Sequence, residues 1–231
     1  MGLNDKTSSI GGSRRGRRKA ALRAILDSRD TDGLLAWARQ NANALSILGT
    51  LLFESDDLLR WRAIEAIGIV AKDAFGDDPE KVRAFLRRLF WLMNDESGGI
   101  CWHAPEAIAE VLLNVPDLQL EFAVILMSYL EEEPFESGVC WAISRLAEAL
   151  SSNDDLAAVA GRKAGVMRKY LAHQDPRRRA SALMALRALS KPIKDALLDP
   201  LRSDTAQASF YDFDTGNLKQ TALADLARTG E

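Results

Sequence analysis

The sequence predicts an all-α fold, an α-solenoid of about four helix pairs, from three observations. A phrase that begins with Glu-Ser and ends at a tryptophan occurs three times, at Trp61, Trp102 and Trp141. A period of about forty residues is typical of arrays of helix pairs, in which each pair buries its apolar face against its neighbours. Ala, Leu, Arg and Glu are plentiful and aromatic residues make up only 7% of the chain, which favours helix over strand.

The two later copies of the phrase are almost identical, ESGGICW at 96–102 and ESGVCW at 136–141. We therefore expect residues 55–203 to form the repeat array. Apolar residues at i, i+4 and i+7 predict the helices of this region. These helices are expected at 57–72, 79–93, 101–112, 117–131, 137–150 and 154–173, with a fourth pair opening at 175. Small side chains at Ala63, Ala104 and Ala180 mark the places where helices are expected to approach most closely.

The segments outside the array have different roles. Residues 1–16 are rich in glycine and serine and are predicted to be a disordered basic arm. Residues 17–54 are predicted to form a helical N-terminal cap, with helices near 17–26, 32–39 and 42–53. Residues 204–231 are predicted to form a C-terminal cap, because aromatic residues flank a glycine turn in 209–219 and indicate a small hairpin before a last helix. Caps cover the apolar ends of a repeat array.

Charge is distributed unevenly along the chain. The net charge is −3, but residues 1–19 carry six basic residues and one acidic residue, so the remainder has a net charge of −8. The uncharged stretch at 40–53 is too short to span a bilayer. The arginine-rich run at 13–19 could be compared with a twin-arginine export signal, but the apolar segment that such a signal requires does not follow it. Only two cysteines are present, which fits a reducing compartment. The sequence therefore predicts a cytoplasmic protein that does not bind a membrane.

Two strings resemble the first helix of HEAT-like repeats of the phycobilisome-lyase type. They are LRWRAIEAIG at 59–68 and ICWHAPEAIA at 100–109. Cys101 replaces the arginine of the pattern in the second string, and the third copy aligns more loosely. The resemblance covers about residues 55–200 and implies an α-solenoid. For function it implies only an interaction surface, which such folds commonly provide.

One helix face is a candidate binding surface. Trp61 and Glu65 are four residues apart, as are Trp102 and Glu106, so each pair shares a face. Such a face suits a base, a cationic ligand or a peptide; the alternative interpretation is packing between repeats. We expect Trp102 to be buried and His103 and Glu106 to be partly exposed. The candidate binding residues are Trp61, Glu65, Trp102, His103, Glu106, Trp141 and Arg145.

The sequence contains no catalytic motif, and it predicts a non-enzymatic protein-interaction scaffold or adaptor with a protein partner. The alternative is a nucleic-acid-binding enzyme similar to the HEAT-like alkylpurine DNA glycosylases, in which Trp102, Glu106 and Arg145 would line a basic surface. The acidic body argues against this alternative, because DNA binding depends on neutralising phosphates.

No cofactor or metal is predicted. Cys101, His103 and Cys140 lack a fourth zinc ligand, and both cysteines are expected to be small buried apolar residues. The basic arm is a candidate contact for nucleic acid. Its residues are Arg14, Arg15, Arg17, Arg18 and Lys19.

Overall fold

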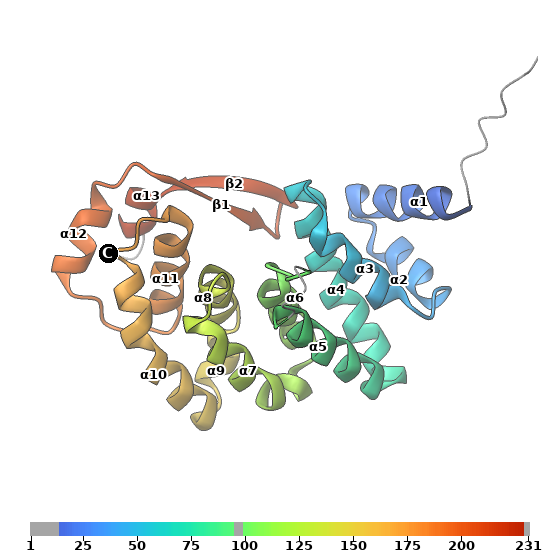
Figure 1. Ribbon diagram of the computed structural model, residues 1–231, viewed down its shortest axis with the longest axis horizontal. Coiled ribbons are helices and arrows are strands. Elements are labelled where there is room, and N and C mark those ends of the chain that lie inside the picture. Colours follow the sequence, from blue (N-terminus) through green and yellow to red (C-terminus); the bar gives the residue numbers. More distant parts are fainter. Residues whose placement is uncertain (1–13, 95–98, 229–231) are drawn as a thin grey trace, which may run out of the picture.

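The computed structural model describes residues 14–94 and 99–228, and most of them are helical (Figure 1). Thirteen α-helices and one two-stranded antiparallel sheet lie within these ranges. The helices follow one another along the long axis of the molecule, and the two strands run along one side of this row. The structure confirms the prediction of a mainly helical protein with a small non-helical element near the C-terminus.

Three short helices open the described chain. They are α1 (Arg14–Ser28), α2 (Thr31–Arg39) and α3 (Ala44–Thr50), and a 3-10 turn follows at Leu51–Phe53. Asp30 begins α2 because its side chain accepts a hydrogen bond from the Gly33 amide. The helix expected at 42–53 is shorter than predicted and ends in the 3-10 turn. Helix α1 begins three residues before the expected start, and residues 1–13 of the predicted arm lie outside the described residues.

Four helices pack one against the next through the centre of the molecule. They are α4 (Asp57–Asp77), α6 (Ala104–Asn114), α8 (Glu136–Arg145) and α11 (Pro176–Ala188). Their contact faces carry small residues, and Ala63, Ala104 and Ala180 are wholly buried, so the helix backbones approach closely. Helix α6 begins at Ala104 rather than at the expected residue 101, because Pro105 occupies its first turn.

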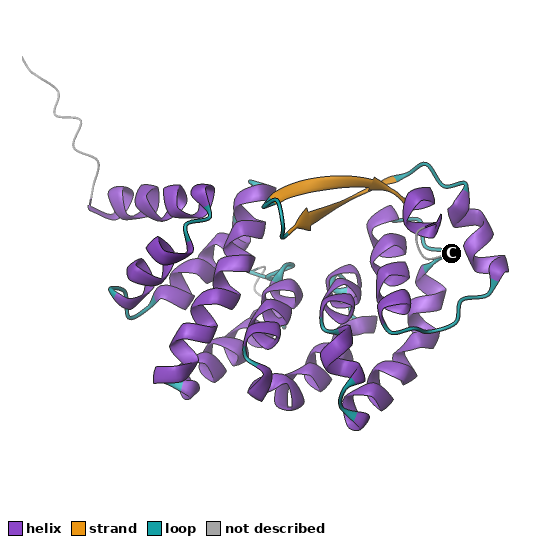
Figure 2. Ribbon diagram, turned by 180° about the vertical axis from the view of Figure 1, so that it is seen from behind, coloured by secondary structure: helices purple, strands orange, loops and turns teal. Residues whose placement is uncertain are grey.

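A second set of helices lies on one side of this central row (Figures 1 and 2). It comprises α5 (Pro79–Met93), α7 (Gln119–Ser128), α9 (Ala147–Ser151) and α10 (Asp154–Tyr170). Helix α5 begins as expected, with Asp78 capping the Lys81 amide and Pro79 in the first turn. The Phe90 and Phe122 rings stack with centroids 6.1 Å apart and join α5 to α7.

The C-terminal region contains α12 (Asp195–Arg202), β1 (Gln207–Asp212), β2 (Asn217–Ala222) and α13 (Leu223–Arg228). The strands are antiparallel and pair Gln207 with Ala222 and Asp212 with Asn217. Gly216 closes their turn with a φ of +68°, a conformation that glycine adopts without strain. Figure 2 shows the hairpin crossing from the α11–α13 end of the molecule towards α4.

Among the described residues, no single helix is long and apolar enough to cross a membrane. The segments Ala104–Asn114 and Pro116–Glu131 pass this test together by length and composition, but the chain bends by 119° between them.

Candidate functional site

Trp61 and Trp141 lie together beneath the C-terminal hairpin. Their ring centroids are 5.0 Å apart, and each residue is 3% exposed. Tyr211 of β1 stacks on Trp61 at 5.9 Å, and Phe213 in the turn contacts both Tyr211 and Trp141. The hairpin therefore covers two of the three repeated tryptophans, and these two serve as packing residues.

Glu65 lies at the edge of this aromatic cluster and holds three elements together. Arg29, in the turn between α1 and α2, donates to its carboxylate at 2.6 Å, and the Tyr211 hydroxyl donates at 2.7 Å. Arg29 also donates to the carbonyl oxygens of Phe213 and Asp214. The bond to Glu65 raises the pKa of Arg29. Two effects raise the pKa of Tyr211: burial is the larger, and the hydrogen bond to Glu65 is the second.

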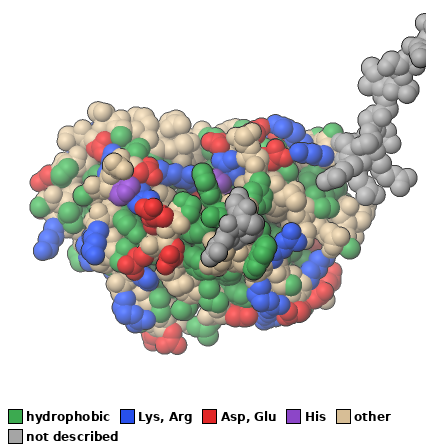
Figure 3. Space-filling model, viewed as in Figure 1, with side chains coloured by type: hydrophobic (Ala, Val, Ile, Leu, Met, Phe, Trp, Pro, Cys, Tyr) green, Lys and Arg blue, Asp and Glu red, His purple; other side chains and the backbone are tan. Residues whose placement is uncertain are grey.

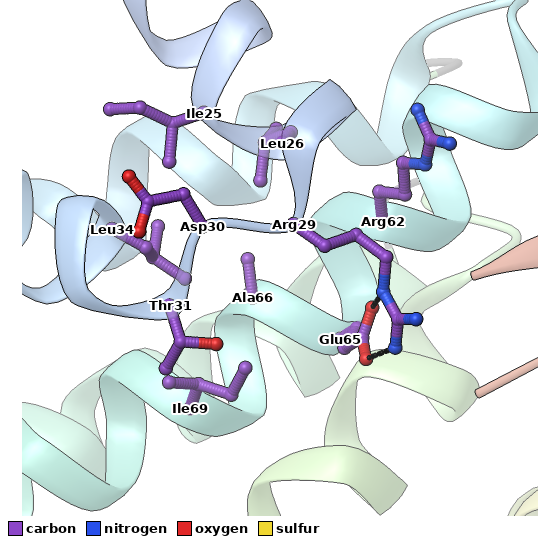
Figure 4. Close-up of a pocket in the computed structure, with 10 residues that line it drawn as sticks. All are labelled: Ile25, Leu26, Arg29, Asp30, Thr31, Leu34, Arg62, Glu65, Ala66 and Ile69. Carbon is purple, nitrogen blue, oxygen red and sulfur yellow. Dashed lines mark hydrogen bonds and ion pairs between the residues drawn. The ribbon is translucent and has the colours of Figure 1, made fainter. Parts of the chain in front are cut away.

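A cavity of about 150 Å³ lies beside the Arg29–Glu65 pair (Figure 4). Ile25, Leu26 and Leu34 form its apolar side, and Arg62 lies on the same side as the ion pair. The Arg62 side chain is committed to other contacts, because it pairs with Asp27 at 2.9 Å and donates to the Gly216 carbonyl. The charged groups of this cavity are thus already used to join the N-terminal helices to the hairpin.

Arg145 pairs with Glu110, a residue that the sequence analysis missed. The Arg145 Nε donates to Glu110 Oε1 at 2.9 Å, and its guanidinium lies 4.1 Å from the Phe213 ring centroid. Burial raises the pKa of Glu110, and the Arg145 bond only partly offsets this effect. The sequence did contain a signal, since Glu110 is one turn after Glu106 in an otherwise apolar helix.

Glu106 is buried, and the expectation of partial exposure was wrong. It is 1% exposed and accepts a hydrogen bond of 2.9 Å from Arg177 of α11, while His103 Nδ1 lies 3.4 Å away at ion-pair distance. Because α6 begins at Ala104, Glu106 lies in the first helical turn and points towards α8. A Cβ at Gly138 would lie 2.9 Å from Glu106 Oε2, so the glycine makes room for the carboxylate.

Trp102 is exposed, and the expectation that it is buried was also wrong. Its exposed fraction is 65%, because it lies in the turn that precedes α6 and not on the buried face of that helix. The three repeated tryptophans consequently do not form one continuous ladder. His103 is intermediate in exposure, as expected.

A further buried ion pair, also missed from the sequence, joins α8 to α11. Arg178 Nη1 forms an ion pair with Glu136 Oε1 at 3.0 Å and lies 3.1 Å from His173 Nε2. Burial raises the pKa of the Cys140 thiol nearby and raises that of Cys101 to about 12. Both thiols are protonated at neutral pH and are poor nucleophiles. The described residues contain no group of three or more His, Cys, Asp or Glu side chains suited to a metal ion.

Comparison with known proteins gives one relationship. No family model matches the sequence, and no solved structure matches it. An uncharacterized protein of Archaeoglobus fulgidus is 31% identical to this chain over 182 residues, which are 78% of this chain and 92% of that protein. The chain belongs to the family of this archaeal protein. The aligned length is greater than that of the predicted repeat region, so the relationship extends beyond a single helix pair.

The chemistry of the site follows from its geometry. Each buried carboxylate described above is neutralised by an arginine from another helix or turn, and two of the three tryptophans are covered. An arrangement of this kind fixes the packing of the helices, because each arginine joins two elements that are distant in the chain. In the basic arm, Lys19 pairs with Glu54 at 2.6 Å, and the side chains of residues 14–18 are not described.

Proposed function

We propose that the protein is a protein-interaction scaffold built as an α-solenoid of HEAT-like helix pairs. The consecutive packing of α4, α6, α8 and α11, with α5, α7 and α10 on one side, supports this architecture. The arginine–carboxylate pairs between successive repeats support it as well, because they are spaced like the repeats: Arg145 binds Glu110, 35 residues earlier, and Arg83 binds Glu121, 38 residues later.

An exposed apolar face on α5 and α7 carries the functional part of the proposal. Trp91 of α5 is 63% exposed and Leu120 of α7 is 57% exposed, and Val124 and Ile125 are also exposed on α7. The stacked Phe90 and Phe122 join the two helices that carry these exposed side chains. Exposed tryptophans surrounded by apolar residues are typical anchors of protein interfaces.

The partner proposed for this face is a different protein, with an apolar helix and a net positive charge. Each copy of the present chain has a net charge of −3, and its body without residues 1–19 has a net charge of −8. Repulsion between two such bodies opposes self-association and favours a basic partner. The rim charges Arg83 and Arg87 are already paired with Glu121 and Glu80. Attraction to the partner therefore comes from the acidic body as a whole and weakens as salt is added.

The glycosylase alternative draws less support. Trp61, Trp141 and Glu106 are almost fully buried, whereas a base-binding surface must be open. On the face in Figure 3, Lys and Arg side chains lie among Asp and Glu side chains rather than in one band. A duplex needs a basic track to follow its phosphates.

The test is affinity capture from the source organism with the wild-type protein and a Trp91→Ala/Leu120→Ala variant. The control is Arg162→Ala, a change at an exposed position of α10. We expect a basic protein that binds wild type and control, and that in purified form binds the double variant at least about tenfold more weakly. Light scattering is run in parallel. Equal binding by the double variant, or a homodimer that the double variant abolishes, overturns the proposal.

A further inference from the structure

We propose that the cavity between α3 and α5 binds an oxyanion, namely a phosphate monoester carried on a small apolar body. The cavity has a volume of about 260 Å³. It is lined by Ala42, Asn43, Leu45, Ser46, Lys81, Ala84, Phe85 and Arg88. This site is separate from the apolar face of α5 and α7, and the inference holds whether or not that face binds a protein.

The cavity is unusual in its charge. Lys81 and Arg88 both line it, and none of the residues described around it is acidic. Neither cation forms an ion pair or a side-chain hydrogen bond with any described residue, whereas Arg83 and Arg87 of the same helix are paired. In a body with a net charge of −8, two unpaired cations at one cavity indicate a site for an anion.

The geometry of the cations suits a phosphate group. Lys81 and Arg88 are seven residues apart on α5, so they lie on one side of the helix about 10.5 Å apart along its axis. Both side chains are long enough to reach a group held between them. A guanidinium offers a planar pair of donors and an ammonium a compact charge, a combination that binds phosphate oxygens well.

Two neutral side chains add donors from α3. Asn43 precedes the helix, and its side chain makes no capping hydrogen bond. Ser46 lies in the first turn and is exposed. Like Lys81 and Arg88, both are without a side-chain partner among the described residues, so four donor groups surround the same space.

The rest of the lining is apolar, which defines the body of the ligand. Phe85 forms part of the wall and packs closely on α3, since a Cβ placed on Gly49 would lie 3.2 Å from its ring. Leu45 and Ala84 complete this part of the wall. A phosphate attached to a single ring fits this volume and composition better than a bare phosphate ion, which would leave the apolar wall unused.

An adjoining cavity limits the site on one side. It is lined by Asp73, Asp77 and Asp78, and it shares Lys81 with the proposed site. Asp73 is paired with Arg39, and Asp78 accepts from the Lys81 amide. Asp77 and Asp78 precede Lys81 in the chain and Arg88 lies seven residues after it, so repulsion from these carboxylates favours an anion close to Arg88.

The experiment is an NMR titration of the full-length, ¹⁵N-labelled protein with phenyl phosphate, inorganic phosphate and benzyl alcohol. We expect saturable amide shifts within 42–46 and 81–88, with tighter binding of phenyl phosphate than of inorganic phosphate and none of benzyl alcohol. Lys81→Met and Arg88→Met are each expected to weaken phenyl phosphate binding about tenfold, the effect of losing one charge-assisted contact. Arg87→Met, a change at the neighbouring exposed and paired residue, is the matched control and is expected to bind like wild type.

Three results overturn the inference. They are the absence of saturable shifts in these two segments, an equal loss of affinity in Arg87→Met, and inorganic phosphate binding as tightly as phenyl phosphate. The substituted side chains lie on the surface of α5, so the variants are expected to fold, and circular dichroism checks this. If either methionine variant unfolds, Ser46→Ala provides the second test and is expected to weaken binding several-fold.

Discussion

The Tyr211 hydroxyl donates a hydrogen bond of 2.7 Å to Glu65, which lies 146 residues earlier in the chain. Arg29 reaches the same carboxylate from the turn between α1 and α2. One partly buried carboxylate therefore joins the C-terminal hairpin to α4 and to the N-terminal helices. Because the hairpin also covers Trp61 and Trp141, this contact helps to hold the hairpin over the two rings.

Tyr211→Phe tests the contribution of this hydrogen bond. The variant keeps the ring that stacks on Trp61 and removes only the hydroxyl, so we expect the free energy of unfolding to fall by about 1.5–3 kcal/mol, as for a bond to a charged group. Urea unfolding measures it. The comparison is Tyr170→Phe, which removes a bond to the neutral Leu130 carbonyl and is expected to cost about 0.5–1.5 kcal/mol. A larger loss in Tyr170→Phe would contradict the central role of Glu65.

Gly216→Ala tests the turn of the hairpin. The residue has a φ of +68°, and an added Cβ would collide with the Arg29 side chain, so we expect a loss of about 1–3 kcal/mol. Gly165→Ala in α10 is the control, because no atom lies within 4 Å of its added Cβ; it is expected to gain about 0.5–1 kcal/mol from helix propensity. Thermal unfolding distinguishes them, and two shifts of the same sign would show that the turn is not constrained in this way.

The tryptophans differ in burial and should differ in their effect on stability. Trp141→Ala removes a ring from the cluster beneath the hairpin, and we expect a loss of about 3–5 kcal/mol. Trp102→Ala removes an exposed ring, and we expect a change within about 0.5 kcal/mol. Urea unfolding measures both. Acrylamide quenching of the Trp102→Ala protein should also fall relative to wild type, and an unchanged quenching profile would place Trp102 in the interior.

The sequence predicted the features that depend on local chemistry. Asp78 and Pro79 start α5 where a cap and a first-turn proline require it, and the aromatic residues around Gly216 predicted the hairpin. Helical periodicity likewise placed Ala63 and Ala104 on buried faces. These signals lie within a few residues of the structure they specify, so no knowledge of distant contacts was needed.

The candidate site depended on contacts that the local pattern does not contain. Spacing placed Trp102 and Glu106 on one helix face, but the helix begins only at Ala104, so Trp102 lies before it and is exposed. The partner of Glu106 is Arg177, 71 residues later, and nothing in the periodicity relates the two positions. Periodicity does not predict the position of the hairpin over Trp61 either, because that position depends on contacts of Tyr211 with Trp61 and Glu65, about 150 residues earlier in the chain.

The pH dependence of stability tests the buried carboxylates of α6. Burial by itself raises the pKa of Glu106, but the interactions with His103 and Arg177 outweigh it and hold the pKa below its ordinary value. A carboxylate with a lowered pKa in the folded state contributes stability above its unfolded pKa, about 4.3, and loses it as pH falls through the folded pKa. The pKa of Glu110 is shifted upwards. Its contribution has the opposite sign, present below the unfolded pKa and lost as pH rises through the folded one.

Glu106→Gln and Glu110→Gln are therefore a matched pair on one helix. Glutamine keeps the volume of each side chain and cannot ionise. We expect Glu106→Gln to lower the free energy of unfolding at pH 7 by about 1–3 kcal/mol, because Arg177 loses its charged partner. We also expect it to flatten the fall in stability as the pH drops below the unfolded pKa. Glu110→Gln should keep that fall and make it steeper, since the group it removes stabilises the folded state only when it is protonated. Urea unfolding at a series of pH values measures both slopes, and a flattened slope in Glu110→Gln with an unchanged one in Glu106→Gln would reverse the assignment of the two carboxylates.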